Sequence, residues 1–107
     1  MDAEVHVTPF QRRVYDETRK IPRGTVVSYG ELARRIGCGS AQAVGQALRR
    51  NPFAPEVPCH RVVAADGSLN GFAGERSGAA LARKQALLES EGVVVVDGRV
   101  VGGRIGN

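Results

Sequence analysis

Residues 28–50 read SYGELARRIGCGSAQAVGQALRR, and this stretch predicts two short helices joined by a tight turn. In the first helix, expected over 29–36, the apolar Leu32 and Ile36 recur at helical spacing, opposite the charged side chains. Gly37 follows, where a helix end favours a residue in the left-handed conformation. This pattern is typical of a helix-turn-helix, whose second helix usually enters a groove of DNA.

The second helix is expected over 41–50, with Ser40 as its N-cap. Val44 and Leu48 recur at helical spacing on one face, and Asn51-Pro52 ends the helix because proline restricts the residue before it. An ordinary helical hairpin packed in a core has the same features. The pattern alone therefore leaves both interpretations open.

Basic residues gather around these helices. The chain carries 15 lysines and arginines against 11 acidic residues, for a net charge of +4, and 13 of the 15 are arginines. Arginine binds phosphate through paired hydrogen bonds, so a local cluster suits a polyanionic partner. A solvated basic face explains the same composition. The cluster comprises Arg34, Arg35, Arg49, Arg50 and Arg61.

A cysteine directly before a histidine is the strongest chemical signal, in Pro58-Cys59-His60-Arg61-Val62-Val63. A thiolate is a strong nucleophile, and a neighbouring imidazole is a ready base. The two valines that follow predict an extended, buried exit from the motif. For an isolated pair, a buried structural thiol beside a chance histidine is the favoured explanation, because short motifs often match by chance.

Together these residues resemble the active, C-terminal domain of the 6-O-alkylguanine-DNA alkyltransferases, also called methylated-DNA–protein-cysteine methyltransferases. The resemblance runs from Thr8 to about Val96, and its most specific part is Pro-Cys-His-Arg-Val at 58–62 behind the predicted helix-turn-helix. Its other landmarks lie at 24–33, 43–48, 50–52, 71–74 and 87–92. The expected fold is mainly α with a small C-terminal β-hairpin, a winged helix-turn-helix-like DNA-binding domain formed by residues 1–107 as one domain.

The resemblance implies a DNA repair protein that flips 6-O-alkylguanine out of double-stranded DNA and transfers the alkyl group irreversibly to its own cysteine. Cys59 is then the nucleophile of a single-turnover reaction that needs no cofactor. His60 accepts its proton through a water molecule, and Glu91 orients His60. Asn51 hydrogen-bonds the turn that carries Cys59, and Tyr29 donates to the departing base.

The resemblance also assigns binding residues. The residues expected to contact the substrate base are Leu48, Val62, Phe72 and Ala73. The residues expected to contact DNA are Ala41, Gln42, Ala43, Gly45, Arg49, Arg50 and Arg61. Gln42 departs from the family, which normally has an arginine finger there. The chain also carries extra residues after Gly74, in the loop that forms one wall of the family's alkyl pocket.

The flanks of the motifs predict further elements. Near the start, Thr8 and Gln11 form a capping box for a helix that begins at Pro9. Little precedes this helix, so we expect the active domain to stand alone. Toward the end, a helix is expected over 81–90, followed by a hairpin around Asp97-Gly98. The last residues, 102–107, are expected to be a frayed tail.

Cysteine usage and the N-terminal sequence indicate the cellular compartment in which the protein works. We expect both cysteines to be reduced in an intracellular monomer, in the cytoplasm near the nucleoid, or in the nucleus of a eukaryote, because no signal peptide precedes them. No apolar run reaches membrane-spanning length, and the cysteines and histidines lack zinc-site spacing.

Two other functions stay open. Alkyltransferase-like proteins bind alkylated guanine and pass it to nucleotide excision repair, but they replace the nucleophilic cysteine with tryptophan or alanine. A helix-turn-helix regulator would bind a palindrome, usually as a dimer. Retention of Cys59 together with His60 and Glu91 favours the enzyme.

Overall fold

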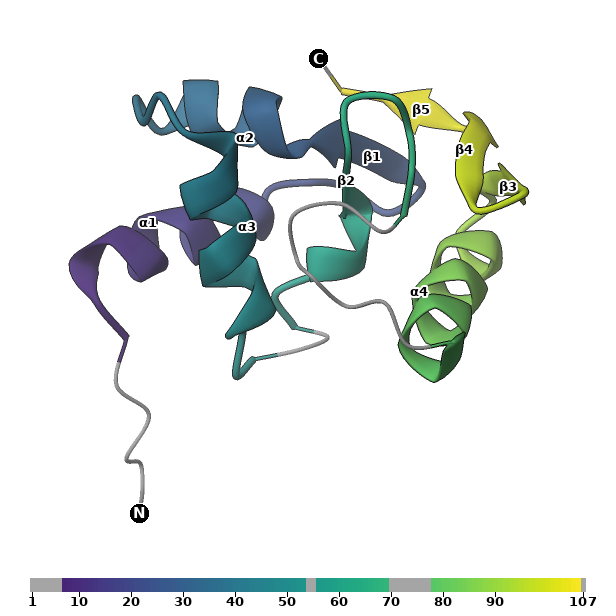
Figure 1. Ribbon diagram of the computed structural model, residues 1–107, viewed down its shortest axis with the longest axis horizontal. Helices are drawn as coiled ribbons and strands as arrows, with labels where there is room; N and C mark the ends of the chain where they lie inside the picture. Colours follow the sequence, from purple (N-terminus) through teal and green to yellow (C-terminus); the bar gives the residue numbers. More distant parts are fainter. Residues whose placement is uncertain (1–6, 54–55, 70–77, 107) are drawn as a thin grey trace.

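The computed structural model describes residues 7–53, 56–69 and 78–106. In these ranges the three N-terminal helices gather at one end of the molecule, and the last helix and a hairpin lie at the other (Figure 1). The elements are α1 (Pro9–Thr18), β1 (Thr25–Ser28), α2 (Tyr29–Arg35), α3 (Ala41–Arg49), a 3-10 turn η1 (Cys59–Arg61), β2 (Val62–Val63), α4 (Gly78–Ser90), β3 (Val94–Val96), β4 (Arg99–Gly102) and β5 (Arg104–Ile105).

The predicted helix-turn-helix is confirmed as α2 and α3, each one residue shorter than expected. The Ser28 hydroxyl accepts from the Glu31 N–H in the first turn of α2, and the Ser40 hydroxyl accepts from the Ala43 N–H in the first turn of α3, both at 3.0 Å. Gly37 has a φ of +71°, the left-handed value expected at the end of α2. Local capping chemistry therefore sets both helix starts and the turn between them.

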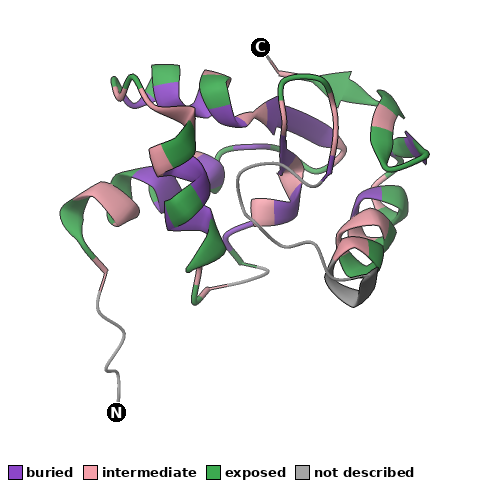
Figure 2. Cartoon of the chain, in the orientation of Figure 1, coloured by how far each residue is buried: buried purple, intermediate pink, exposed green. Residues whose placement is uncertain are grey.

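Helix α1 braces this pair. Its capping box is present as predicted, with Thr8 and Gln11 exchanging hydrogen bonds at 3.0 Å. Val14 and Tyr15 are fully buried against α2 and α3, and the Tyr15 hydroxyl donates to the Ala47 carbonyl at 2.7 Å. Figure 2 shows this buried face between the three helices. The first core cluster therefore fixes the position of α3, the predicted recognition helix.

A three-stranded parallel sheet, in the order β2-β1-β5, pairs three segments that are distant in sequence. The extended exit predicted for Val62 and Val63 is confirmed as β2. The frayed tail predicted for 102–107 is wrong, because Gly106 N–H donates to the Val26 carbonyl at 2.9 Å and Arg104 N–H to the Gly24 carbonyl at 3.2 Å. A glycine-rich segment with no apolar periodicity pairs here through its backbone alone.

The predicted C-terminal hairpin is confirmed as β3 and β4, and α4 begins at Gly78, three residues earlier than expected. Asp97 and Gly98 both have positive φ, 54° and 74°, as a two-residue turn of type I′ requires. Leu88 and Val95 bury this unit in a second core cluster. The fold is therefore mainly α with a small C-terminal hairpin, as predicted. Within the described ranges no helix is both long and apolar enough to cross a membrane.

We expect β5 to contribute measurably to stability. Removing residues 103–107 deletes its two backbone hydrogen bonds to β1 and its neighbourhood, and the bond from Arg35 to the Gly106 carbonyl. At roughly 0.5–1.5 kcal/mol for each of these three hydrogen bonds, the free energy of unfolding should fall by about 1.5–4.5 kcal/mol in urea denaturation. Ile105→Ala is the control, because its side chain is exposed and should change stability little. An unchanged urea midpoint after truncation would support the original prediction of a frayed tail.

Candidate active site

The turn η1 presents Cys59 and His60 at the junction of the helical half and the sheet. Cys59 N–H donates to the Val57 carbonyl at 2.8 Å, and Arg61 N–H donates to the Pro58 carbonyl at 2.9 Å. The next residue, Val62, pairs with Val27 of β1 and fixes the end of the turn. Cys59 is partly exposed, whereas His60 is buried. The thiol is thus accessible on a turn that is held at both ends.

His60 and Glu91, 31 residues apart, form a direct contact of 2.8 Å between Nε2 and Oε2. Their side chains are only 7% and 5% exposed, so water barely competes for this hydrogen bond. A carboxylate accepts and does not donate, so Nε2 carries the proton and Nδ1 is left as the basic nitrogen. The pair therefore fixes one tautomer of His60.

His60 is held in its neutral form. Burial lowers its pKa below the usual 6.5; the hydrogen bond and charge of Glu91 oppose this effect, and the charges of Arg61 and Lys84 reinforce it. A neutral imidazole with a free Nδ1 is the form that accepts a proton.

Besides His60, both Arg61 and Gly24 donate hydrogen bonds to the Glu91 carboxylate. Arg61 donates from Nε to Oε1 at 2.9 Å and from Nη2 to Oε2 at 2.7 Å, and Gly24 N–H reaches Oε1 at 3.2 Å. Burial raises the pKa of Glu91, but the hydrogen bonds from Arg61, His60 and Gly24 outweigh it and lower the pKa to about 2. Glu91 is therefore an ionised, buried acceptor at neutral pH.

Arg61 differs from its predicted place on the DNA surface. Its guanidinium turns inward, with its side chain 16% exposed, and its Nη1 donates to the Ile21 carbonyl at 2.8 Å in addition to the two bonds to Glu91. All the hydrogen bonds that the structure shows for this guanidinium thus go to Glu91 and Ile21, inside the protein. Instead of a predicted contact with DNA, the structure shows Arg61 in contact with Glu91, the partner of His60.

Asn51 and Tyr29 approach the motif from the helices. Asn51 Nδ2 donates to the Val57 carbonyl at 2.9 Å, and its Oδ1 accepts from Phe53 N–H at 2.9 Å. It therefore links the end of α3 to the segment just before Cys59, as predicted for the turn. Tyr29, the first residue of α2, is 1% exposed and belongs to the core cluster that Cys59 packs against.

Lys84 of α4 is a site residue that the sequence interpretation missed. Its Nζ donates to the carbonyls of Val62 at 2.9 Å and Leu69 at 3.2 Å, and it lies 5.9 Å from the centre of the Tyr29 ring. Burial lowers its pKa to about 8, partly offset by the nearby Cys59. The signal was available, because Lys84 shares the spacing of Leu81 and Leu88 on the inward face of the helix.

The residues of α3 that were predicted to contact DNA differ in their exposure. Gln42, Arg49 and Arg50 are exposed, whereas Gly45 is buried with the core residues of the helix. Gln46, one turn after Gln42, is exposed on the same side and joins this row, although the prediction omitted it. The remaining small residues, Ala41 and Ala43, are half-buried, and the predicted base contacts Leu48 and Val62 are buried.

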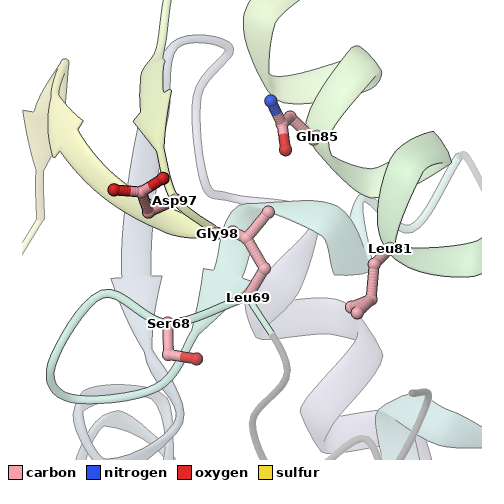
Figure 3. A pocket seen from close by; sticks show the side chains of 6 residues that line it. All are labelled: Ser68, Leu69, Leu81, Gln85, Asp97 and Gly98. Carbon is pink, nitrogen blue, oxygen red and sulfur yellow. The ribbon is translucent and has the colours of Figure 1, made fainter. Parts of the chain in front are cut away.

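Two predicted substrate residues, Phe72 and Ala73, lie outside the described residues, as does most of the segment after Gly74. Among the described residues, a hollow of about 150 Å³ lies between α4 and the β3–β4 turn, where Leu81 and Gln85 face Asp97 and Gly98 (Figure 3). The described residues that line it include none of the predicted catalytic side chains. Over the described ranges, His, Cys, Asp and Glu form no group of three that could hold a metal ion.

Known proteins share this sequence and fold. The profile of the family described as 6-O-methylguanine DNA methyltransferase, DNA binding domain, matches residues 9–93. The methylated-DNA–protein-cysteine methyltransferase of Salmonella typhimurium is 46% identical over 90 residues, which are 83% of this chain and 50% of that protein. The crystal structure of the Mycobacterium tuberculosis O6-methylguanine methyltransferase superposes with a TM-score of 0.71 at 46% identity, over 85% of this chain and 54% of that chain.

A third relative is matched over most of its length. Atl1 of S. pombe, crystallised with damaged DNA that contains O6-carboxymethylguanine, superposes with a TM-score of 0.74 at 34% identity. The match covers 86% of this chain and 83% of that chain. In contrast, this chain spans about half the length of the curated methyltransferases it matches.

The structure is a helix-turn-helix domain with a cysteine and a histidine on a turn. The chain belongs to the 6-O-methylguanine DNA methyltransferase family, through its DNA-binding domain.

The Glu91 contacts predict a pH-dependent stability. Its pKa of about 2 in the folded protein lies below the ordinary 4.5, so its contribution is complete above about pH 4.5 and is lost as the pH falls toward 2. Glu91→Gln should therefore lower the free energy of unfolding at pH 6 by roughly 2 kcal/mol or more, because Arg61 is left without its charged partner. In urea denaturation at pH 3, this difference should be smaller.

Glu31→Gln is the matched control. Glu31 also has a pKa of about 2, owing to its bonds with Arg34 and Arg35, but that cluster lies at the surface. Salt should reduce the effect of Glu31→Gln far more than that of Glu91→Gln. A Glu91→Gln penalty that stayed constant from pH 6 to pH 3 would contradict the assigned charge.

Proposed function

We propose that this protein repairs DNA by accepting the alkyl group of 6-O-alkylguanine on Cys59. The observation that carries the proposal is an accessible thiol on a rigid turn, directly before a buried His60 that Glu91 holds with Nε2 protonated. A soft sulfur nucleophile beside a neutral base suits displacement at an alkyl carbon. Membership of the methyltransferase family supports the same reaction.

The transfer balances without any cofactor. The thiol proton leaves Cys59 for Nδ1 of His60 through a water molecule, and the thiolate sulfur attacks the alkyl carbon. The sulfur–carbon bond forms as the carbon–oxygen bond breaks, and the electron pair stays on guanine. The Tyr29 hydroxyl supplies a proton to the base, and the proton held by His60 replaces it through solvent. The products are unmodified guanine and S-alkylcysteine.

The thioether product makes the reaction irreversible. The proposed site contains no group that cleaves a carbon–sulfur bond, so each molecule repairs one lesion. Glu91 keeps its hydrogen bond while His60 carries the extra proton, and its charge stabilises that state. The triad of Cys59, His60 and Glu91 thus provides attack and proton transfer, while Asn51 holds the turn on which Cys59 lies.

Double-stranded DNA is the proposed partner. The exposed row of Gln42, Gln46 and Arg49 on α3 is the surface offered to a groove, with Arg50 at its end. A base inside the duplex has to be flipped out to reach Cys59. Glutamine at 42 fills the gap and hydrogen-bonds the orphaned base without adding charge, so we propose weaker binding or slower flipping than with an arginine finger.

An alkyltransferase-like role is the second candidate, because Atl1 of S. pombe, crystallised with damaged DNA, superposes on this chain with a TM-score of 0.74 at 34% identity. In that role the protein would bind alkylated guanine and pass it to nucleotide excision repair proteins. Cys59 distinguishes the two roles, since the alkyltransferase-like proteins lack the nucleophilic cysteine. We therefore place the enzyme first.

Incubation with an oligonucleotide containing 6-O-methylguanine should add one methyl group to each protein molecule, as measured by intact mass. Cys59→Ala should show no adduct but should still bind the lesion. Cys38→Ala is the matched control, because it removes the chain's other thiol, which lies in the α2–α3 turn. Lesion binding without an adduct in the parent protein would transfer the assignment to the alkyltransferase-like role.

The uncharged Gln42 at the finger position leads to a second prediction. Gln42→Arg should tighten binding to duplex DNA and speed single-turnover repair at low salt, because it adds a charge beside the phosphates and the opened base pair. The gain should shrink as salt rises, and it should be smaller on single-stranded DNA, where no pair is opened.

Gln46→Arg is the control for charge alone, since it adds the same group one turn along the same exposed face of α3. It should tighten binding without a matching gain in the duplex repair rate. A Gln42→Arg variant that repairs duplex no faster than the parent at low salt would defeat the finger assignment.

A further inference from the structure

We propose that Arg61 is a positioning residue that keeps His60 neutral by sharing the charge of Glu91. This inference rests on the proposed function, because a neutral His60 matters as the base for Cys59. The side-chain hydrogen bonds that the structure shows for Arg61 go to Glu91 and the Ile21 carbonyl, and Arg61 acts on His60 through Glu91.

The contact geometry supports this role. Arg61 spans both carboxylate oxygens of Glu91, with Nε on Oε1 at 2.9 Å and Nη2 on Oε2 at 2.7 Å. The oxygen that receives the shorter of these bonds, Oε2, is the one that accepts from His60 at 2.8 Å. One carboxylate oxygen therefore serves the imidazole and the guanidinium together. Its attraction for a second proton on His60 is weaker than that of a carboxylate without a cation.

The position of Arg61 is fixed from a third side. Its Nη1 donates to the Ile21 carbonyl at 2.8 Å, in the segment between α1 and β1. The fork of a guanidinium makes all these bonds in one plane, whereas an ammonium group is a point charge that cannot span two oxygens in this way. Arginine therefore fixes both the charge and the orientation of Glu91.

Three charged groups face His60 from the elements around it. Glu91, after α4, raises its pKa, whereas Arg61 on η1 and Lys84 on α4 lower it. An uncompensated Glu91 beside a buried imidazole would instead favour the imidazolium, which has no free nitrogen to accept a proton. Burial is the largest cause that lowers the pKa of His60, and the Arg61 contacts limit how far Glu91 reverses it.

NMR titration of His60 tests the proposal directly. The chain has two histidines, His6 and His60, and His6→Gln assigns their signals. Removing the charge of Arg61, with Arg61→Gln or Arg61→Met, should raise the pKa of His60 by about one unit or more. Arg61→Lys keeps a cation without the two-oxygen fork and should raise the pKa less than the charge-removing variants do. In repair assays the charge-removing variants should lose rate at pH 7 and regain it at higher pH.

A double variant separates this role from a merely structural one. In a Glu91→Gln background, removing Arg61 should raise the pKa of His60 less than it does beside Glu91, because only the direct repulsion between Arg61 and the imidazolium is then lost. The double variant also removes the buried, unpaired carboxylate that could unfold the single variants. Arg23→Met is the control, since Arg23 donates to the Ser90 carbonyl at the end of α4 without touching Glu91.

The outcomes are decisive in either direction. An unchanged or lowered His60 pKa in the folded single variants would overturn the proposal, as would an equal shift with and without Glu91. A rate loss of the same factor at every pH would show that Arg61 only supports the fold. The titration needs no repair activity, so a parent protein that fails to accept a methyl group would contradict the proposed function and leave this test intact.

Discussion

The buried carboxylate of Glu91 is the contact on which the arrangement of this molecule depends. It accepts hydrogen bonds from His60 and Arg61 on η1 and from Gly24 before β1, and so joins three segments that are distant in sequence. Burying a carboxylate is costly unless its acceptor sites are filled. Here they are filled, and the resulting order places the turn with Cys59 against α4.

Gly24 shows how tightly this junction is built. Its φ is +83°, in the left-handed region, and a Cβ atom there would lie 3.0 Å from the Glu91 carbonyl oxygen. Glycine is therefore required both for the backbone conformation and for the close approach. The same residue donates its N–H to the Glu91 side chain. A glycine far from the cysteine in sequence thus helps to orient its base.

The sequence predicted what local rules decide. Capping by Thr8, Ser28 and Ser40 follows from contacts three residues away, and the Asp97-Gly98 turn is recognisable from its own residues. The family motif predicted the pairing of His60 with Glu91, which spacing alone would not reveal.

The features that the sequence did not predict depend on partners that are distant along the chain. Strand β5 forms through backbone pairing with β1, about 79 positions away in register between Thr25 and Arg104, and glycine-rich sequence carries no sign of it. The inward turn of Arg61 needs Glu91, 30 residues along the chain, to be in place. Lys84 was visible in principle, but a single cation on an apolar helix face is more often a solvent-seeking side chain.

The central claim is that Glu91 holds His60 as a neutral base with Nδ1 free toward Cys59. The ¹⁵N chemical shifts of the His60 ring at neutral pH, read through their couplings to the ring carbon-bound protons, test it most directly. The account predicts a protonated Nε2 and an unprotonated Nδ1. A proton on Nδ1, or an imidazolium carrying protons on both nitrogens, would contradict it.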